Sequence, residues 1–199
     1  MRLLPLLFLT CLLAASPPAA AQTLAEAVQL LEKKEYVKAR DLLEKVVLQG
    51  NVQAEVMLAD MYMRPTGIPR NTVRGMALYQ TAANKGNPEA QFALATEYNK
   101  GEIVPQDKKR AMGLWRTSAK LKHPGAQFVL CVEESTDGSK YYDIEEAYAW
   151  CETSAGRKHK QSGDAAKRSK EALKKVEAKG GVKAVEAAKA RALRYAKAY

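Results

Sequence analysis

The residues best suited to chemistry in this chain are few, and they stand apart from one another. The two histidines, His123 and His159, have no carboxylate or thiol at the sequence spacing of a metal site or of a general base. A lone histidine on a turn is ordinarily solvated, so we expect no metal ligation from either ring. The sequence therefore predicts a protein that is not an enzyme and that uses no metal or cofactor.

The strongest chemical signal is a cluster of cations towards the C-terminus. Residues 156–199 contain 14 Lys and Arg and 4 Asp and Glu, and they account for the whole net charge of +10. Clustered cations attract any polyanion, so this tail is a candidate for binding an anionic surface, a glycan or an acidic protein. A solvated helix face is the alternative, and nucleic acid is disfavoured because no aromatic residue is interleaved before Tyr195. The candidate residues are Lys167, Arg168, Lys170, Lys174, Lys175, Lys179 and Lys183.

The first 21 residues have the pattern of a secretory signal peptide. Arg2 precedes an apolar run over residues 3–15, which is followed by Ser16, two prolines and three alanines. The run is shorter than the ~20 residues that a membrane-spanning helix requires. We therefore expect cleavage before Gln22, a periplasmic or secreted protein, and no transmembrane segment in the mature chain.

The sequence repeats itself at a fixed spacing, and this repeat indicates which helices position the residues named above. Small, apolar and aromatic residues recur every 36 positions without a gap. A period of this length is typical of stacked helical hairpins that share one continuous core. The matching positions are Ala54, Ala90 and Ala126; Leu58, Leu94 and Leu130; Ala59, Ala95 and Cys131; Gly75, Ala111 and Ala147; and Tyr79, Trp115 and Cys151.

Each unit contains two apolar runs at helical spacing, separated by a turn. Asn71, Asp107 and Asp143 stand just before the second run, where a short polar side chain caps a helix. We predict an all-α fold, an α-α superhelix that is a solenoid of antiparallel helix hairpins with C-terminal capping helices. Its parts are a degenerate N-terminal hairpin at 22–50, three repeats at 51–155, and basic capping helices at 156–199 that break at Gly180 and Gly181.

A family resemblance then becomes specific. The stretch from Pro88 to Lys122, PEAQFALATEYNKGEIVPQDKKRAMGLWRTSAKLK, resembles a Sel-1-like repeat, which is related to the tetratricopeptide repeat. The third unit departs from the pattern, because Glu134 replaces the tyrosine of the first helix and residues 137–139 form an irregular turn, so we expect this unit to be distorted. The matching residues are Ala90, Leu94, Ala95, Tyr98, Gly101, Val104, Pro105, Asp107, Ala111 and Trp115.

Cys131 and Cys151 are the cysteines that remain after removal of a signal peptide. They fall on the two helices of one predicted hairpin, and a secreted protein meets oxidising conditions, so a disulfide is one interpretation. Two packed free thiols are the other, because other repeats place Ala, Tyr or Trp at these positions.

The predicted shape and the resemblance imply a scaffold or adaptor that binds a partner protein on the concave face of the solenoid. Met57 and Met61 lie one turn apart and offer either an adaptable contact or partial burial against the N-terminal unit. The positions that vary between repeats are the candidate contacts: Met57, Ala93 and Val129; Asp60, Thr96 and Val132; and Met61, Glu97 and Glu133.

The resemblance also implies two alternative functions. Some secreted relatives are immunity proteins that neutralise antibacterial effectors in the periplasm. Cysteine-rich relatives have been linked to penicillin binding, which raises a β-lactamase-like activity. Neither Ser-x-x-Lys nor Lys-Thr-Gly occurs in the sequence, so the enzyme alternative is disfavoured.

Overall fold

A computed structural model describes residues 19–199, with side chains from Thr23 onwards. The predicted signal peptide, residues 1–21, lies almost wholly outside this part of the chain. The described residues form helices joined by turns, and they contain no strand. The helices are α1 (Ala19–Glu32), α2 (Tyr36–Leu48), α3 (Val52–Met63), α4 (Thr72–Asn84), α5 (Pro88–Lys100), α6 (Lys108–Lys120), α7 (Pro124–Ser135), α8 (Ile144–Ala155) and α9 (Ser162–Ala198).

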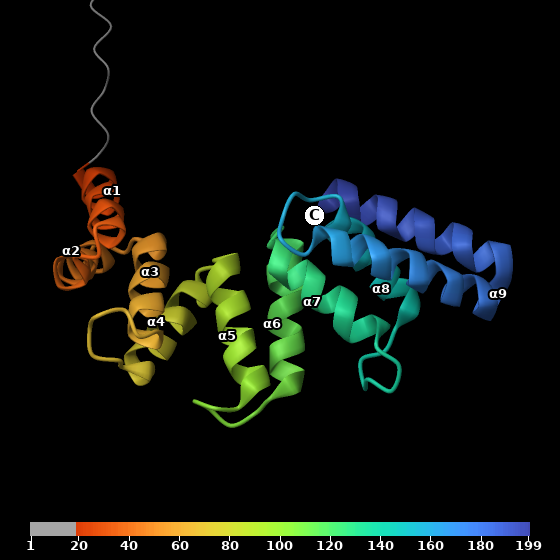
Figure 1. Ribbon diagram of the computed structural model, residues 1–199, viewed down its shortest axis with the longest axis horizontal. Helices are drawn as coiled ribbons and strands as arrows, with labels where there is room; N and C mark the ends of the chain where they lie inside the picture. The colour runs from red at the N-terminus through yellow and green to blue at the C-terminus, as the bar shows by residue number, and fades with distance from the viewer. Residues whose placement is uncertain (1–18) are drawn as a thin grey trace, which may run out of the picture.

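The helices pack as hairpins in series (Figure 1). Each helix contacts the one before it and the one after it, and α9 packs mainly on α8 with a smaller contact to α7. The buried core follows the same order, because its apolar clusters lie within and between successive hairpins. The predicted all-α solenoid is confirmed.

Side-chain caps fix where the second helix of each repeat begins. Asn71, Asp107 and Asp143 each accept a hydrogen bond from the backbone N–H three residues ahead. These caps confirm the sequence prediction, since a free N–H at a helix start needs an acceptor.

The first helices have a matching set of caps that the sequence analysis missed. Asn51 and Asn87 accept from the backbone N–H of Ala54 and Ala90. His123 takes the same place in the third repeat, where its Nδ1 accepts from the backbone N–H of Ala126 at 3.1 Å. The 36-residue spacing of these three residues was the available signal.

The third repeat keeps the backbone hydrogen bond that closes the other two, so the expected distortion is confined to its turn, where the N–H groups of Ser139 and Tyr142 donate to the carbonyls of Thr136 and Ser139. The backbone N–H of Asp143 donates to the carbonyl of Glu134 at 3.0 Å. The equivalent bond closes the first repeat from Asn71 to Tyr62, also at 3.0 Å. The hairpin closes through the backbone and does not depend on the tyrosine side chain.

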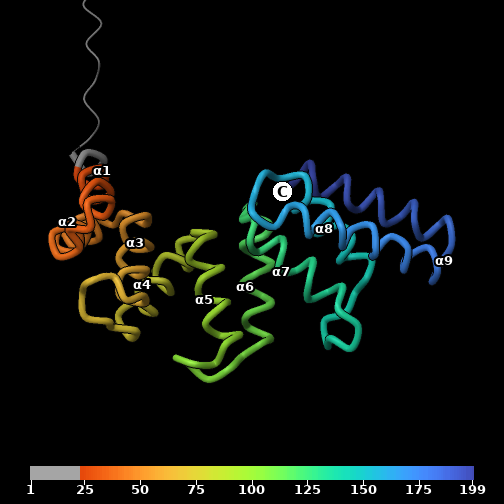
Figure 2. Tube along the Cα trace, in the orientation of Figure 1, coloured from red at the N-terminus to blue at the C-terminus, as the bar shows by residue number. Residues whose placement is uncertain are grey.

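The tail doubles back on itself. Helix α9 changes direction at Gly181, whose φ of 63° and ψ of −158° lie outside the helical region and suit glycine. We refer to residues 162–180 as the first half of α9 and to residues 182–198 as the second half. Figure 2 shows the second half returning towards the loop that precedes α9. There the Arg157 guanidinium donates to the backbone carbonyl of Tyr199.

Candidate functional site

One hollow among the described residues is a cleft between the first and second repeats. Its volume is about 230 Å³, and most of its wall comes from the first helices α3 and α5. We call it the α3–α5 cleft. Its lining includes Asp60, Met63, Arg64, Arg70, Tyr79, Glu89, Phe92, Ala93, Thr96, Glu97, Lys100, Glu102 and Ile103.

On the side of the first repeat, the wall of the cleft contains a hydrogen-bonded pair, Tyr79 and Asp60. The buried Tyr79 hydroxyl donates to Asp60 Oδ1 at 2.7 Å, and the Arg64 guanidinium lies 3.2 Å from the same oxygen. Burial, and then the hydrogen bond to the Asp60 carboxylate, raise the pKa of Tyr79 well above its usual value. The tyrosine therefore stays neutral, and it holds Asp60 in place at the cleft.

His123 contacts two residues of the cleft wall, Glu89 and Phe92, and is not the solvated histidine that the sequence suggested. Its Nε2 lies 2.8 Å from Glu89 Oε2, and its ring stacks on Phe92 with centroids 4.4 Å apart. The hydrogen bond to His123 holds the pKa of Glu89 below its usual value. Nδ1 caps α7, and Nε2 joins the start of α7 to α5 through Glu89, so both ring nitrogens are used.

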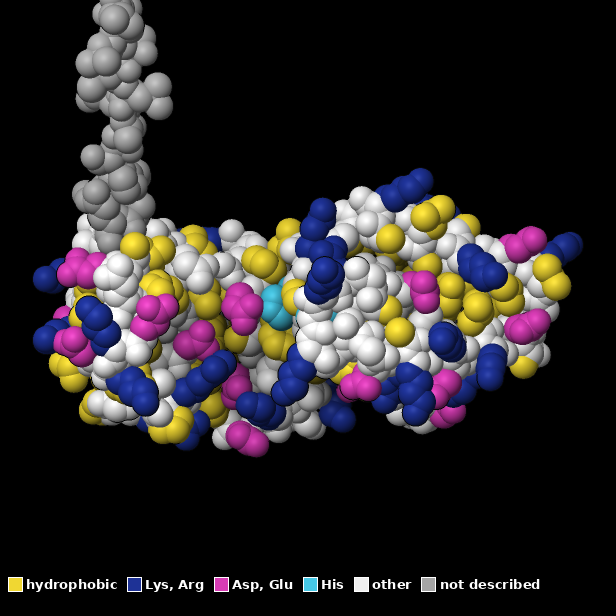
Figure 3. Space-filling view, turned by 45° about the horizontal axis from the view of Figure 1, so that its top comes forward, with side chains coloured by type: hydrophobic (Ala, Val, Ile, Leu, Met, Phe, Trp, Pro, Cys, Tyr) yellow, Lys and Arg dark blue, Asp and Glu magenta, His cyan; other side chains and the backbone are white. Residues whose placement is uncertain are grey.

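Helix α5 completes the cleft with groups that are themselves held in place. Lys100 Nζ lies 3.0 Å from Glu97 Oε1, and the Thr96 hydroxyl donates to the carbonyl of Phe92 at 2.9 Å. The cleft therefore presents carboxylates and cations on a partly aromatic floor. Figure 3 shows Asp and Glu side chains intermixed with Lys and Arg over the repeats.

The structure brings together only some of the contact residues that the sequence suggested. Asp60, Thr96 and Glu97 all line the α3–α5 cleft. Met61 does not, because it is 2% exposed and belongs to the core of the N-terminal hairpins, against which Met57 also packs. These two methionines fill the interior, as the alternative interpretation of them held.

The contact residues suggested on α7 lie elsewhere. Val129 is half-buried against the core around Trp115 and Trp150. Glu133 lines a more open hollow of about 660 Å³ between the turn after α5 and the turn after α7. The suggested contacts thus divide between two hollows and the core.

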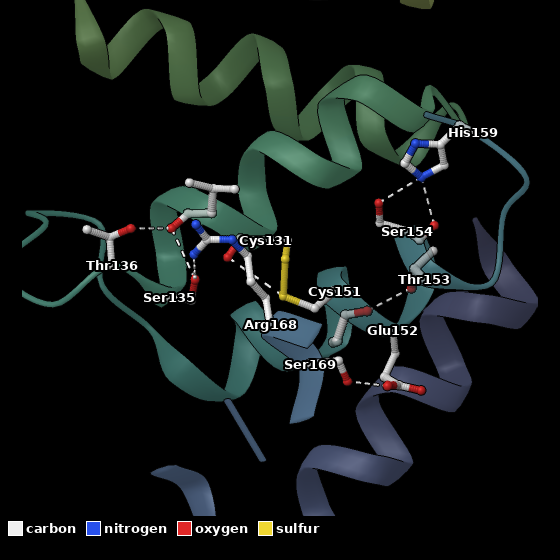
Figure 4. The surroundings of a disulfide bond; sticks show 12 residues. Cys131, Ser135, Thr136, Cys151, Glu152, Thr153, Ser154, His159, Arg168 and Ser169 are labelled. Atoms are coloured by element: carbon white, nitrogen blue, oxygen red, sulfur yellow. Dashed lines mark hydrogen bonds between the residues drawn. A yellow bond between two sulfur atoms is a disulfide. The ribbon is translucent and has the colours of Figure 1, made fainter. Parts of the chain in front are cut away.

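Cys131 and Cys151 are joined by a disulfide between α7 and α8 (Figure 4). Both residues are fully buried. Close by, the Ser169 hydroxyl donates to Glu152 and so links α9 to α8. His159 Nε2 lies 3.0 Å from the Ser154 hydroxyl, which makes this second histidine a local structural contact too.

A buried carboxylate marks the third repeat. Glu134 is fully buried, and its Oε1 accepts from the Arg116 guanidinium at 2.7 Å, while Oε2 has no partner. Burial outweighs the attraction of Arg116 and raises the pKa of Glu134 to about 7. The sequence analysis noted this residue only as a departure from the repeat pattern.

The cations of the tail fall into two groups. Lys175 Nζ lies 2.6 Å from Asp137, and Arg168 contacts the Ser135 hydroxyl, so these two hold α9 against the third repeat. Lys167, Lys170 and Lys174 are exposed and make no ion pair or hydrogen bond with another described side chain. The predicted cluster is therefore partly structural and partly free.

Other kinds of site find no support in the part of the chain that the structure describes. Between residues 19 and 199 there is no group of three or more His, Cys, Asp and Glu side chains that could hold a metal ion. None of the helices in this range is both long and apolar enough to cross a membrane.

Hairpins in series with a cleft between their first helices define the class, which is the α-helical repeat solenoid. Within this class the chain belongs to the Sel1 repeat family. The family model named Sel1 repeat matches residues 52–87, 88–123 and 124–159, which confirms the resemblance noted in the sequence. No curated protein matches this chain.

Solved structures show the same fold. A Sel1 repeat protein from Oxalobacter formigenes has a TM-score of 0.64 and 20% identity, over 79% of this chain and 63% of that one. A protective antigen of uropathogenic Escherichia coli strains that displays an SLR fold has a TM-score of 0.55 and 19% identity, over 90% of this chain and 46% of that one. The chain thus spans less than two thirds of the length of either protein.

An immunity protein from Pseudomonas aeruginosa is a more distant match. Its TM-score is 0.40 and its identity is 17%, over 79% of this chain and 81% of that one. The immunity alternative gains no support from so weak a likeness.

Proposed function

We propose that the chain binds a partner protein in the α3–α5 cleft. Sel1 repeats generally form scaffolds for protein–protein interaction, and this chain carries three of them in series. The partner enters as a segment that places both charged and apolar side chains between the first two repeats.

The observation that carries the proposal is the makeup of the cleft wall. Phe92 and Ala93 offer apolar surface, while Asp60 and Glu97 are held by Tyr79 and Lys100. Side chains that are already fixed lose little freedom when a partner docks, so such a surface binds at a lower entropic cost. Thr96 lies on the same wall between these groups.

The test is to fill the cleft with one substitution and to measure the capture of the partner. Thr96→Arg places a long side chain in the cleft, and we expect capture from an envelope fraction to fall by about tenfold or more, which corresponds to ~1.4 kcal/mol. Thr117→Arg is the matched control, because Thr117 is exposed on α6 and makes the same kind of hydrogen bond, from its hydroxyl to the carbonyl of Gly113. Equal capture by both variants would show that the partner binds elsewhere.

We also propose that the protein works in the periplasm or outside the cell, as the N-terminal sequence pattern and the disulfide favour. Expression with and without residues 2–21, followed by fractionation, tests this location. The full chain should reach the periplasm in a shortened form, and the truncated chain should stay in the cytoplasm. The opposite distribution would reject the proposed location.

The immunity role remains a narrower form of the same binding function, and it requires an adjacent toxin gene. A β-lactamase-like activity would need a nucleophile with a nearby base. The described cleft offers carboxylates and cations paired with one another instead. Nitrocefin turnover by the purified protein would be the result that argues for an enzyme.

A further inference from the structure

The first half of α9 carries its free lysines on one side. Ala165, Ser169, Ala172 and Val176 are buried and recur at intervals of three and four residues. Lys167, Lys170 and Lys174 have the same spacing but are offset by about half a helical turn. They therefore point away from α8 and into solvent, and we call these three residues the lysine ridge.

The second half of α9 adds exposed apolar side chains to exposed cations. Val182 is 70% exposed and Leu193 is 58% exposed. They lie eleven residues apart, close to three full turns, so they share one face of the helix. Lys189 and Lys197 are exposed beside them on this half. Figure 3 shows hydrophobic, Lys and Arg side chains together at this end of the molecule, with a few Asp and Glu side chains among them.

The rest of α9 is anchored, which keeps these side chains turned outwards. Arg191 lies 3.3 Å from Glu146 on α8, and the Tyr195 hydroxyl donates to the same carboxylate. Tyr195 also packs on the buried Trp150 with ring centroids 4.7 Å apart. The cations that face the repeats are thus paired, whereas those that face solvent are free.

We propose that the outward side of α9 binds anionic phospholipid headgroups at a membrane surface. Lysine ammonium groups act as point charges that need no fixed partner geometry, which suits mobile headgroups. Each basic side chain near an anionic leaflet contributes about 1 kcal/mol. Val182 and Leu193 can enter the boundary between headgroups and acyl chains, which an acidic protein partner would not require.

The test uses the purified protein and sedimentation with vesicles. Vesicles of phosphatidylethanolamine and phosphatidylglycerol should bind the protein, and vesicles of phosphatidylcholine alone should not. The Lys167→Gln, Lys170→Gln, Lys174→Gln variant should bind the anionic vesicles about 100-fold more weakly, from three contributions of about 1 kcal/mol. Binding should also weaken as salt rises.

The matched control changes the same charge elsewhere. Lys108→Gln, Lys109→Gln, Lys120→Gln removes three exposed lysines of α6 that make no ion pair with a described side chain. This variant should keep most of the binding. An equal loss in both variants would overturn the proposal, because net charge alone would then account for the binding.

A second variant and a second polyanion distinguish a lipid surface from an acidic protein. Val182→Ser with Leu193→Ser should weaken vesicle binding, because these side chains enter the lipid boundary. Binding to polyglutamate without binding to anionic vesicles would reject the lipid surface in favour of an acidic protein. The Thr96→Arg variant should bind vesicles like the unsubstituted protein. The two proposals can therefore fail independently: Thr96→Arg tests partner binding in the cleft, and vesicle binding tests α9.

Discussion

The second and third repeats are both closed by one backbone hydrogen bond but differ in what they bury and expose. In the second repeat, Arg110 lies over the Tyr98 ring at 4.3 Å from its centroid, near the turn. In the third, Glu134 and Glu146 take the places of these two residues, and Arg116 faces them from the repeat before. The backbone bond that closes the turn is the same in both. The 36-residue period therefore specifies the hairpin, whereas the charge of the residues beside the turn differs between repeats: Arg110 in the second and Glu146 in the third.

The first two repeats and the third repeat also differ in whether another helix covers them. The first helices α3 and α5 leave an open cleft between them. Helices α7 and α8 are joined by a disulfide and covered by α9. We infer a division of roles, in which the first two repeats bind a partner and the third forms a closed and anchored end.

The largest expected effect comes from removing the disulfide. Cys131→Ala with Cys151→Ala should lower the free energy of unfolding by roughly 3 kcal/mol, because the bond closes a loop of 20 residues. Urea denaturation measures this loss. Reductant added to the unsubstituted protein should have a similar effect, and the cleft should bind its partner as before. Unchanged stability would show that the third repeat needs no covalent closure.

The buried carboxylate of Glu134 predicts a pH dependence of stability opposite in sign to that of Glu89 in the second repeat, whose pKa is lowered. Folding raises the pKa of Glu134 from 4.5 to about 7, so the folded state holds this proton more tightly than the unfolded state. The free energy of unfolding should therefore fall by on the order of 2 kcal/mol as pH rises from 4.5 to 7. Denaturation across this range measures the slope.

Glu134→Gln should remove this part of the slope, because the amide does not titrate. Glu133→Gln is the control, since its side chain is half-exposed beside an open hollow. A slope that is unchanged by Glu134→Gln would assign the pH dependence to other groups.

The smallest expected effect is the loss of stability on removing a helix cap, compared between the second and third repeats. Asp107→Ala and Asp143→Ala should each cost about 1 kcal/mol, because each removes one acceptor from an equivalent helix start. Thermal unfolding of the two variants measures the difference between them. A much larger loss at Asp143 would show that the third hairpin depends on its cap where the second does not.

The sequence predicted the hairpins, the second-helix caps and the family, because these depend on residues that recur at one spacing. It left open whether Met61 contacts a partner or is buried, because the packing of this side chain depends on the hairpin that precedes α3. Nor did it predict the contact between His123 and Glu89, which are 34 residues apart and meet only when two repeats stack. Contacts between repeats depend on how the hairpins stack, and the spacing within one repeat does not contain that information.

The most direct measurement uses two variants, each with a photo-crosslinking amino acid at the same position of a different repeat. Position 96 lies in the α3–α5 cleft, and position 132 is its equivalent in the third repeat. Our account predicts that a partner protein crosslinks at position 96 in intact cells and that position 132 gives little or none. Crosslinking at position 132 without crosslinking at position 96 would contradict the assignment of partner binding to the cleft.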